Sequence, residues 1–250
     1  MMAMGAPVED RERSRFRRAA MRPRLRSDAR RATFTSMSID AGPLLESGLR
    51  AALVEIVARE VSSPRVLDAM RELPRHVFVP EHSLGEAYGD YPLPIGHGAT
   101  ISQPTVVGMM SEALALEGSE RILEIGTGSG YQAAVLGRLA HHVDTVEVVP
   151  ELAERARRAL RELGITNVSV HVGDGWSGLP DRAPFDRIVV TAAPDRLPEE
   201  LVAQLAEGGL LVVPVGPQSH DQRLERHQKR EGRLVREDLG AVRFVPMVHR

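Results

Sequence analysis

Two spacings of hydrophobic residues divide the chain. Up to about residue 73, apolar side chains recur at three- and four-residue steps, which is typical of helices with one buried face. The spacing predicts a helix over 44–61 and a second that starts at Ser63 and Pro64, an N-cap and a first-turn proline, and ends at Pro74. Over 75–100 no period holds, and a connection this long is usually functional or disordered. Its aromatic and apolar residues favour a packed, functional loop.

Short apolar runs alternate with helical segments in the rest of the chain. We expect strands at 121–125, 143–148, 168–172, 185–191 and 209–215, and helices at about 104–116, 130–140, 151–163 and 198–206. This alternation predicts a parallel sheet covered on both faces, a doubly wound, Rossmann-like α/β fold. Short β-like runs between 221 and 248 predict antiparallel strands at one sheet edge. The expected fold is therefore a mostly parallel sheet with an antiparallel C-terminal edge and additional N-terminal helices.

Charge sets the first 40 residues apart. They contain ten arginines and five acidic residues, a net charge of +5, whereas the whole chain carries −2 and residues 41–250 therefore carry −7. Large apolar residues are too few and too irregular there to bury a face, so we interpret 1–40 as a basic, disordered arm. It is either a non-essential extension, with Met37 as another possible start, or a tether or targeting peptide.

Composition excludes several classes of protein. Without cysteine the chain has no disulfides, no thiolate nucleophile and no cysteine-based metal site. The nine histidines show no metal-ligand spacing supported by nearby carboxylates, so no metal site is expected. No apolar run approaches the roughly 18 residues of a membrane span, and no secretory signal is recognisable. We expect a cytoplasmic protein.

The most informative motif is "RILEIGTGSGYQAAVL", which runs from Arg121 to Leu136. Gly126, Gly128 and Gly130 lie between a strand and a helix, where the backbone can turn tightly and its amides can approach a ligand. The spacing G-x-G-x-G differs from the dinucleotide pattern G-x-G-x-x-G. Glu124 would repel a pyrophosphate but suits the cationic amino acid end of S-adenosylmethionine. The motif therefore favours that cofactor over a dinucleotide.

Two acidic residues agree with this interpretation. Glu147 ends its strand twenty-one residues after Gly126, near the distance at which a carboxylate accepts hydrogen bonds from a ribose diol. Asp174, in "HVGDGW", ends the next strand, where a short carboxylate can reach an adenine amino group. Each is weak alone, because an acidic residue after a strand is more often a turn residue or a helix cap. Their order and spacing together favour S-adenosylmethionine.

Seven segments of the chain form a recognisable set: "PRHVFVP", "YGDYPLPIGHGATISQP", "LEIGTGSGYQAAVL", "GDGW", "APFDRIVVTAAP", "EGGLLVVPVG" and "RFVPM". Together they resemble the protein-L-isoaspartate O-methyltransferase family, and the resemblance extends from about Leu44 to the C-terminus. The resemblance implies methyl transfer from S-adenosylmethionine, with S-adenosylhomocysteine as product, to the free carboxyl of L-isoaspartyl residues in damaged proteins and peptides, which begins their repair to aspartyl. It also implies one methyltransferase domain over 41–250, with the helices and acceptor-side loop in 41–104 and the cofactor-binding sheet in 105–250.

The resemblance assigns roles to individual residues. It implies that Ser102 is the active-site residue and that the cofactor is held by Thr100, Ile101, Glu124, Gly126, Thr127, Gly128, Gly130, Glu147, Val148, Asp174 and Gly175. A carboxylate acceptor is already ionised at pH 7, so no general base is required and the acceptor must mainly be aligned. Ser102 as a covalent nucleophile is disfavoured, because neither a strained elbow nor an adjacent base surrounds it. A helix N-cap is its plainer role.

The sequence departs from the family pattern in two places, and two alternatives to isoaspartyl methylation stay open. Some family members have a histidine shortly after the serine, where this chain has Thr105, Val106 and Val107, and the C-terminal segment stops early at "FVPMVHR". The alternatives are a methyltransferase for a small molecule or RNA, and a non-catalytic protein that binds an adenosyl cofactor. We expect isoaspartyl proteins and peptides as partners, no nucleic acid or membrane, and a monomer.

Overall fold

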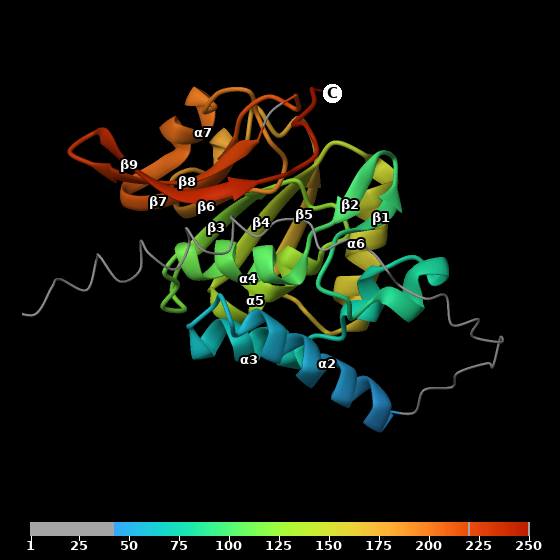
Figure 1. The fold of residues 1–250 in the computed structure, drawn as a ribbon. Coiled ribbons are helices and arrows are strands. Elements are labelled where there is room, and N and C mark those ends of the chain that lie inside the picture. The colour runs from blue at the N-terminus through green and yellow to red at the C-terminus, as the bar shows by residue number, and fades with distance from the viewer. Residues whose placement is uncertain (1–42, 220, 250) are drawn as a thin grey trace, which may run out of the picture.

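The computed structural model describes residues 43–219 and 221–249, which form a central sheet with helices on both faces and a separate two-stranded hairpin (Figure 1). The interpretation of residues 1–40 as a basic arm lies outside the described residues and stays a prediction.

A seven-stranded sheet forms the centre, in the order β5-β4-β3-β6-β7-β8-β9. The strands are β3 (Arg121–Ile125), β4 (His142–Glu147), β5 (Val168–Val172), β6 (Phe185–Val190), β7 (Leu205–Val215), β8 (Gln222–Arg230) and β9 (Arg233–Val242). Strands β3 to β7 pair in parallel, and β8 and β9 add antiparallel pairs at the edge. The predicted fold class is confirmed, although residues 243–248 form no third edge strand.

The strand order reverses between β3 and β6. From β3 the chain proceeds to β4 and β5 on one side, and then returns to place β6 on the other side of β3. In open parallel sheets, ligands bind beyond the carboxyl ends of the strands at such a switch point. A ligand is therefore expected beside the segments that follow β3 and β6.

Helices cover the two faces unequally. One face carries α4 (Pro104–Ala113), α5 (Tyr131–Leu139) and α6 (Pro150–Glu162), and the N-terminal α2 (Pro43–Val57) and α3 (Pro64–Glu72) pack on α4 and α5 (Figure 1). Within the described residues, the other face carries the short α7 (Glu199–Gln204), the 3₁₀ helix η3 (Pro180–Arg182) and loops. Ser63 caps α3 by accepting a hydrogen bond from the Val66 amide at 3.5 Å, as its sequence predicts.

The prediction of a long loop over 75–100 is wrong, because most of these residues form short helices and strands. It contains two 3₁₀ helices, η1 (Arg75–Phe78) and η2 (Glu81–Glu86), and then an antiparallel hairpin of β1 (Leu93–Gly96) and β2 (Ala99–Ile101). The hairpin turns through His97 and Gly98, which both have positive φ. These elements are too short to produce a detectable period, although Phe78, Leu93 and Ile95 are buried.

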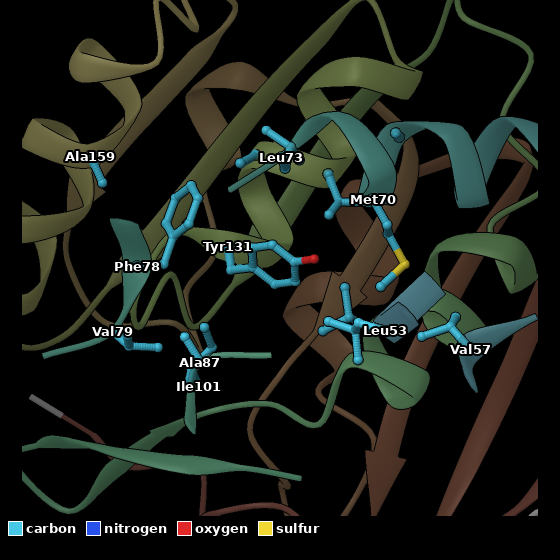
Figure 2. Close-up of a cluster of buried hydrophobic side chains, with 14 of the residues drawn as sticks. Leu53, Val57, Met70, Leu73, Phe78, Val79, Ala87, Ile101, Tyr131 and Ala159 are labelled. Atoms are coloured by element: carbon cyan, nitrogen blue, oxygen red, sulfur yellow. The ribbon is translucent and has the colours of Figure 1, made fainter. Parts of the chain in front are cut away.

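Buried side chains from these elements join the helical layer to the hairpin. Figure 2 shows Tyr131, the first residue of α5, among Phe78, Leu73 and Leu53, which come from three N-terminal segments. The Tyr131 ring is 2% exposed and meets the Phe78 ring edge-on with centroids 5.4 Å apart. The N-terminal elements therefore pack directly against the start of the helix that follows the glycine motif.

Candidate functional site

The glycine motif turns tightly between β3 and α5. Gly126, Gly128 and Gly130 all have positive φ, of 94°, 52° and 90°, which L side chains rarely adopt. A Cβ on Gly126 would lie 2.5 Å from Thr191 Oγ1, and one on Gly130 would lie 3.0 Å from the Ala156 Cβ. Glycine is therefore required here by backbone conformation and by close approach to β6 and α6.

A cavity of about 290 Å³ opens beside this turn, on the carboxyl-end side of the sheet. Its wall includes the β1–β2 turn, the glycine motif, the end of β4 and the C-terminal segment Val245–Val248. Nine of the predicted site residues lie on this wall: Thr100, Ile101, Ser102, Gly126, Thr127, Gly128, Glu147, Val148 and Gly175. The structure brings these segments, far apart in sequence, to one place.

Glu147 holds the glycine motif from the end of β4. One carboxylate oxygen accepts a hydrogen bond from the Gly128 amide at 2.7 Å, and the other accepts one from the Val149 amide at 3.0 Å. The side chain is 6% exposed and lies on the cavity wall. Its position suits a residue that orders the loop and presents negative charge to a ligand.

Three predicted residues do not line the cavity: Glu124, Gly130 and Asp174. Gly130 is the N-cap of α5, and its role is the turn itself. Asp174 accepts a hydrogen bond from the Trp176 amide at 2.9 Å, and its other oxygen lies 3.1 Å from His249 Nδ1. The neighbouring Gly175 is the residue of this turn that reaches the cavity.

Glu124 lies behind the glycine motif rather than on the cavity wall. It is fully buried, and neither of its carboxyl oxygens has a hydrogen-bond partner among the described residues. Burial raises the pKa of Glu124 to about 8; the nearby Thr145 hydroxyl opposes this rise, and the Glu147 carboxylate adds to it. At pH 7 the Glu124 carboxyl is therefore mostly protonated when no cation is bound.

We expect Glu124 to make the stability of the folded protein depend on pH. The pKa of Glu124 is higher in the folded chain than in the unfolded chain, so the folded chain holds an extra proton between about pH 4.5 and 8. Within this range, the contribution of Glu124 to the free energy of unfolding falls by up to about 1.4 kcal/mol for each pH unit by which the pH rises. In urea unfolding from pH 5 to 8, Glu124→Gln should therefore gain stability relative to the unmodified protein as the pH rises. Two parallel pH profiles would contradict this assignment.

A second cavity, of about 400 Å³, adjoins the first. Its wall is formed by the segment before and within α4, by β9 and by the residues after β9. Thr100, Ser102, Thr191 and Val245 line both cavities. These four residues mark the junction at which a group bound in one cavity meets a group bound in the other.

Ser102 is half-buried at this junction, but the expectation that it caps α4 is wrong. Gln103 is the N-cap residue, and no side chain at that position caps the helix. Asp90 performs this role from a distance: its carboxylate accepts hydrogen bonds from the Thr105 amide at 2.9 Å and the Thr105 hydroxyl at 2.8 Å, and from Gln103 Nε2 at 3.0 Å. The Ser102 hydroxyl makes no hydrogen bond within the described part of the chain and remains available to a ligand.

The sequence interpretation missed two parts of the site. Thr191 directly follows β6, and its hydroxyl contacts the Gly126 carbonyl oxygen at 2.6 Å and the Ile125 carbonyl oxygen at 3.0 Å. A polar residue straight after the buried run "FDRIVV" was a usable signal, because the end of β6 meets the glycine motif at the switch point. The second missed part is the C-terminal segment, which runs beside Ala193. The Ala193 amide donates a hydrogen bond to the Val245 carbonyl oxygen at 2.8 Å, and the Met247 amide donates one to the Ala193 carbonyl oxygen at 2.9 Å. The motif "RFVPM" in this segment contributes to the family resemblance, but none of its residues was among the predicted site residues.

The family model for Protein-L-isoaspartate(D-aspartate) O-methyltransferase (PCMT) matches residues 50–250. The chain belongs to this family. A protein-L-isoaspartate O-methyltransferase of Gloeobacter violaceus is 54% identical over 189 residues, 76% of this chain and 92% of the relative. One of Anaeromyxobacter dehalogenans is 56% identical over 187 residues, 74% and 90% of the two chains. The resemblance drawn from the motifs is confirmed.

Solved structures show the same fold. A protein-L-isoaspartate O-methyltransferase superposes with a TM-score of 0.73 at 33% identity, and covers 79% of this chain and 65% of its own length. A candidate member of the family from Plasmodium falciparum, in complex with S-adenosyl-L-homocysteine, superposes with a TM-score of 0.71 at 25% identity. The match covers 80% of this chain and 98% of the Plasmodium chain. The family uses S-adenosylmethionine, and the cavity beside the glycine motif fits that cofactor because it combines close backbone approach, a carboxylate and wall residues shared with a second cavity.

The described residues show neither a metal site nor a membrane-spanning helix. Within 43–219 and 221–249, no group of three or more histidine and acidic side chains is arranged to hold a metal ion. No helix in the same ranges has the length and apolar character needed to cross a membrane.

Proposed function

We propose that this methyltransferase esterifies the free carboxyl of L-isoaspartyl residues in damaged proteins and peptides. The observation that carries the proposal is the junction of the two cavities at Thr100, Ser102 and Thr191. One cavity has the glycine motif that suits S-adenosylmethionine, and the other leaves room for a peptide carboxylate. The ester promotes return to the succinimide and so to a normal aspartyl residue, which is repair.

The residues at the junction need to align reactants rather than transfer protons. An isoaspartyl carboxyl has an ordinary pKa near 4 and is ionised at pH 7, so it needs no base. S-adenosylmethionine, when bound, supplies an activated methyl group and a neutral leaving group. The chain contributes a half-buried hydroxyl at Ser102, backbone amides beside it and walls that exclude water from opposite charges, which together favour a near-attack geometry.

For the cofactor, we propose that the predicted residues act in two groups. The eight predicted cofactor residues on the cavity wall contact it directly, with Glu147 toward the ribose hydroxyls, and Ser102 on the same wall faces the acceptor. Glu124 acts from behind the glycine motif, where a nearby cation would favour its ionised form, and Asp174 acts at the adenine end beside Gly175.

We expect Glu147→Ala and Asp174→Ala to weaken the binding of S-adenosylhomocysteine. The loss at Glu147 should be larger, about 10- to 100-fold, because the Gly128 amide loses a charge-assisted bond worth roughly 1.5–3 kcal/mol. Calorimetric titration measures both affinities, with Glu154→Ala on the exposed surface of α6 as control. Unchanged affinity in both variants would refute this placement of the nucleoside.

We also propose that the enzyme works in the cytoplasm as a monomer, without nucleic acid or membrane partners. The net charge of −7 over residues 41–250 supports the absence of nucleic acid, because a phosphate backbone favours basic surfaces. Light scattering on a size-exclusion column tests the monomer.

One experiment separates the proposal from its two alternatives. The protein is incubated with methyl-labelled S-adenosylmethionine and an isoaspartyl peptide, total RNA or no acceptor, and the products are treated with mild alkali. Alkali-labile label on the peptide supports the proposal, since a methyl ester hydrolyses readily. Alkali-stable label on RNA would support a different methyltransferase, and calorimetric binding of the cofactor with no transfer would indicate a non-catalytic binding protein.

A further inference from the structure

Arg75 is a fully buried arginine next to the site. It begins η1, its side chain is 0% exposed, and it lines neither of the two cavities. No carboxylate lies within ion-pair distance of its guanidinium among the described residues. A buried unpaired cation is costly, so its position calls for an explanation beyond packing.

The guanidinium joins three segments that build the site. Its Nη2 donates to the Ser102 carbonyl oxygen at 3.1 Å and to the Tyr91 carbonyl oxygen at 3.3 Å. Its Cζ lies 5.4 Å from the centroid of the Tyr131 ring, within the range of a cation–π contact. Ser102 belongs to the acceptor side, whereas Tyr131 starts α5 behind the glycine motif and lines the cofactor cavity.

A carboxylate restrains the same acceptor segment from a second direction. Asp90 accepts hydrogen bonds from Gln103 and Thr105, directly after the residue whose carbonyl Arg75 holds. Burial lowers the pKa of Arg75, and the charge of Asp90 is among the nearby groups that oppose this shift. Residues 102–105 are therefore fixed on two sides by opposite charges.

Packing alone does not explain why an arginine occupies position 75. Its Nε and Nη1 have no hydrogen-bond partner among the described residues, so the side chain satisfies only part of its donor capacity. An apolar residue of similar volume would avoid this cost. The rigid fork of arginine can bond a carbonyl while its flat face lies on an aromatic ring, which an apolar side chain cannot do.

We propose that Arg75 is a positioning residue for methyl transfer, which fixes the Ser102 main chain relative to Tyr131 and so sets the acceptor segment against the cofactor cavity. It touches neither reactant and acts through Ser102. The effect on turnover rests on the proposed function, whereas the effect on the mobility of residues 99–107 does not.

The test compares Arg75→Met, Arg75→Lys and the control Arg187→Met. Arg187 also donates to main-chain carbonyls, of Leu114 at 2.6 Å and Ala115 at 3.3 Å, but at the far end of α4 and outside both cavities. For each folded protein the melting temperature, the affinity for S-adenosylhomocysteine, kcat and KM on an isoaspartyl peptide, and amide hydrogen exchange over 99–107 are measured.

We expect Arg75→Met to lower kcat at least tenfold and to speed exchange over 99–107, while the affinity for S-adenosylhomocysteine stays within about threefold of the unmodified protein. Arg75→Lys should recover part of kcat, because an ammonium can still bond the Ser102 carbonyl. Arg187→Met should lower only the melting temperature. If Arg75→Met does not fold, the lysine variant decides by the same measures.

Two results would overturn the proposal. One is an Arg75 variant with unchanged kcat and unchanged exchange over 99–107, since Arg75 would then serve stability alone. The other is a loss of S-adenosylhomocysteine binding as large as the loss of kcat, which would place its effect on the cofactor. An unmodified protein that leaves the isoaspartyl peptide unmethylated would sink the proposed function instead, and the exchange measurement would still decide whether Arg75 holds the segment.

Discussion

Replacing Gly126 with alanine is expected to lower the affinity for S-adenosylhomocysteine at least about 100-fold, which corresponds to about 2.8 kcal/mol. Two costs combine at this position. The φ of 94° is unfavourable for any L side chain, at roughly 1–2 kcal/mol, and the new Cβ would lie 2.5 Å from Thr191 Oγ1. Relief of that contact must move either the glycine motif or the end of β6, and both border the cavity.

Gly232→Ala is the matched control for this variant. Gly232 also has a positive φ, of 71°, but open space surrounds the position of its Cβ, and it lies outside both cavities. It should lose stability in urea unfolding and keep the affinity of the unmodified protein in calorimetry. An affinity that falls equally in both variants would mean that general destabilisation, and not the shape of the glycine motif, explains the loss.

Ser102→Ala is expected to lower kcat by roughly 10- to 100-fold and to leave the affinity for S-adenosylhomocysteine nearly unchanged. The hydroxyl lies at the junction of the cavities and has no partner within the described chain, so its loss removes an alignment contact and leaves the glycine motif intact. Since Ser102 does not cap α4, the melting temperature should change little.

Steady-state kinetics on an isoaspartyl peptide and calorimetry with S-adenosylhomocysteine measure the two quantities. Ser63→Ala is the control, because Ser63 does cap a helix, and its loss should cost about 1 kcal/mol of stability without changing kcat. An unchanged kcat in Ser102→Ala would show that the main chain of this segment, rather than the serine hydroxyl, aligns the acceptor.

The sheet and the cofactor wall were predictable because they depend on local sequence. Buried strands of a parallel sheet appear as short apolar runs, and the glycines follow the first of them directly. Once the strands are placed, their carboxyl ends must lie at one edge, which brings Gly126, Glu147 and Gly175 together without further information.

Contacts between distant segments were not predictable in the same way. The N-terminus of α4 is held by Asp90, fourteen residues before the helix, and its own N-cap offers no side chain. The burial of Arg75 and Glu124 is also invisible in sequence, because both residue types are usually exposed. Tertiary packing decides such positions, and in this protein they surround the site.

The most direct test of the proposed activity is a comparison of two peptides that differ only in one linkage. An isoaspartyl peptide and its aspartyl counterpart are incubated with the protein and methyl-labelled S-adenosylmethionine, and alkali-labile methyl ester is counted in each. We expect ester on the isoaspartyl peptide and none above background on the aspartyl peptide. Equal labelling of the two peptides, or no label on either, would contradict the proposed activity.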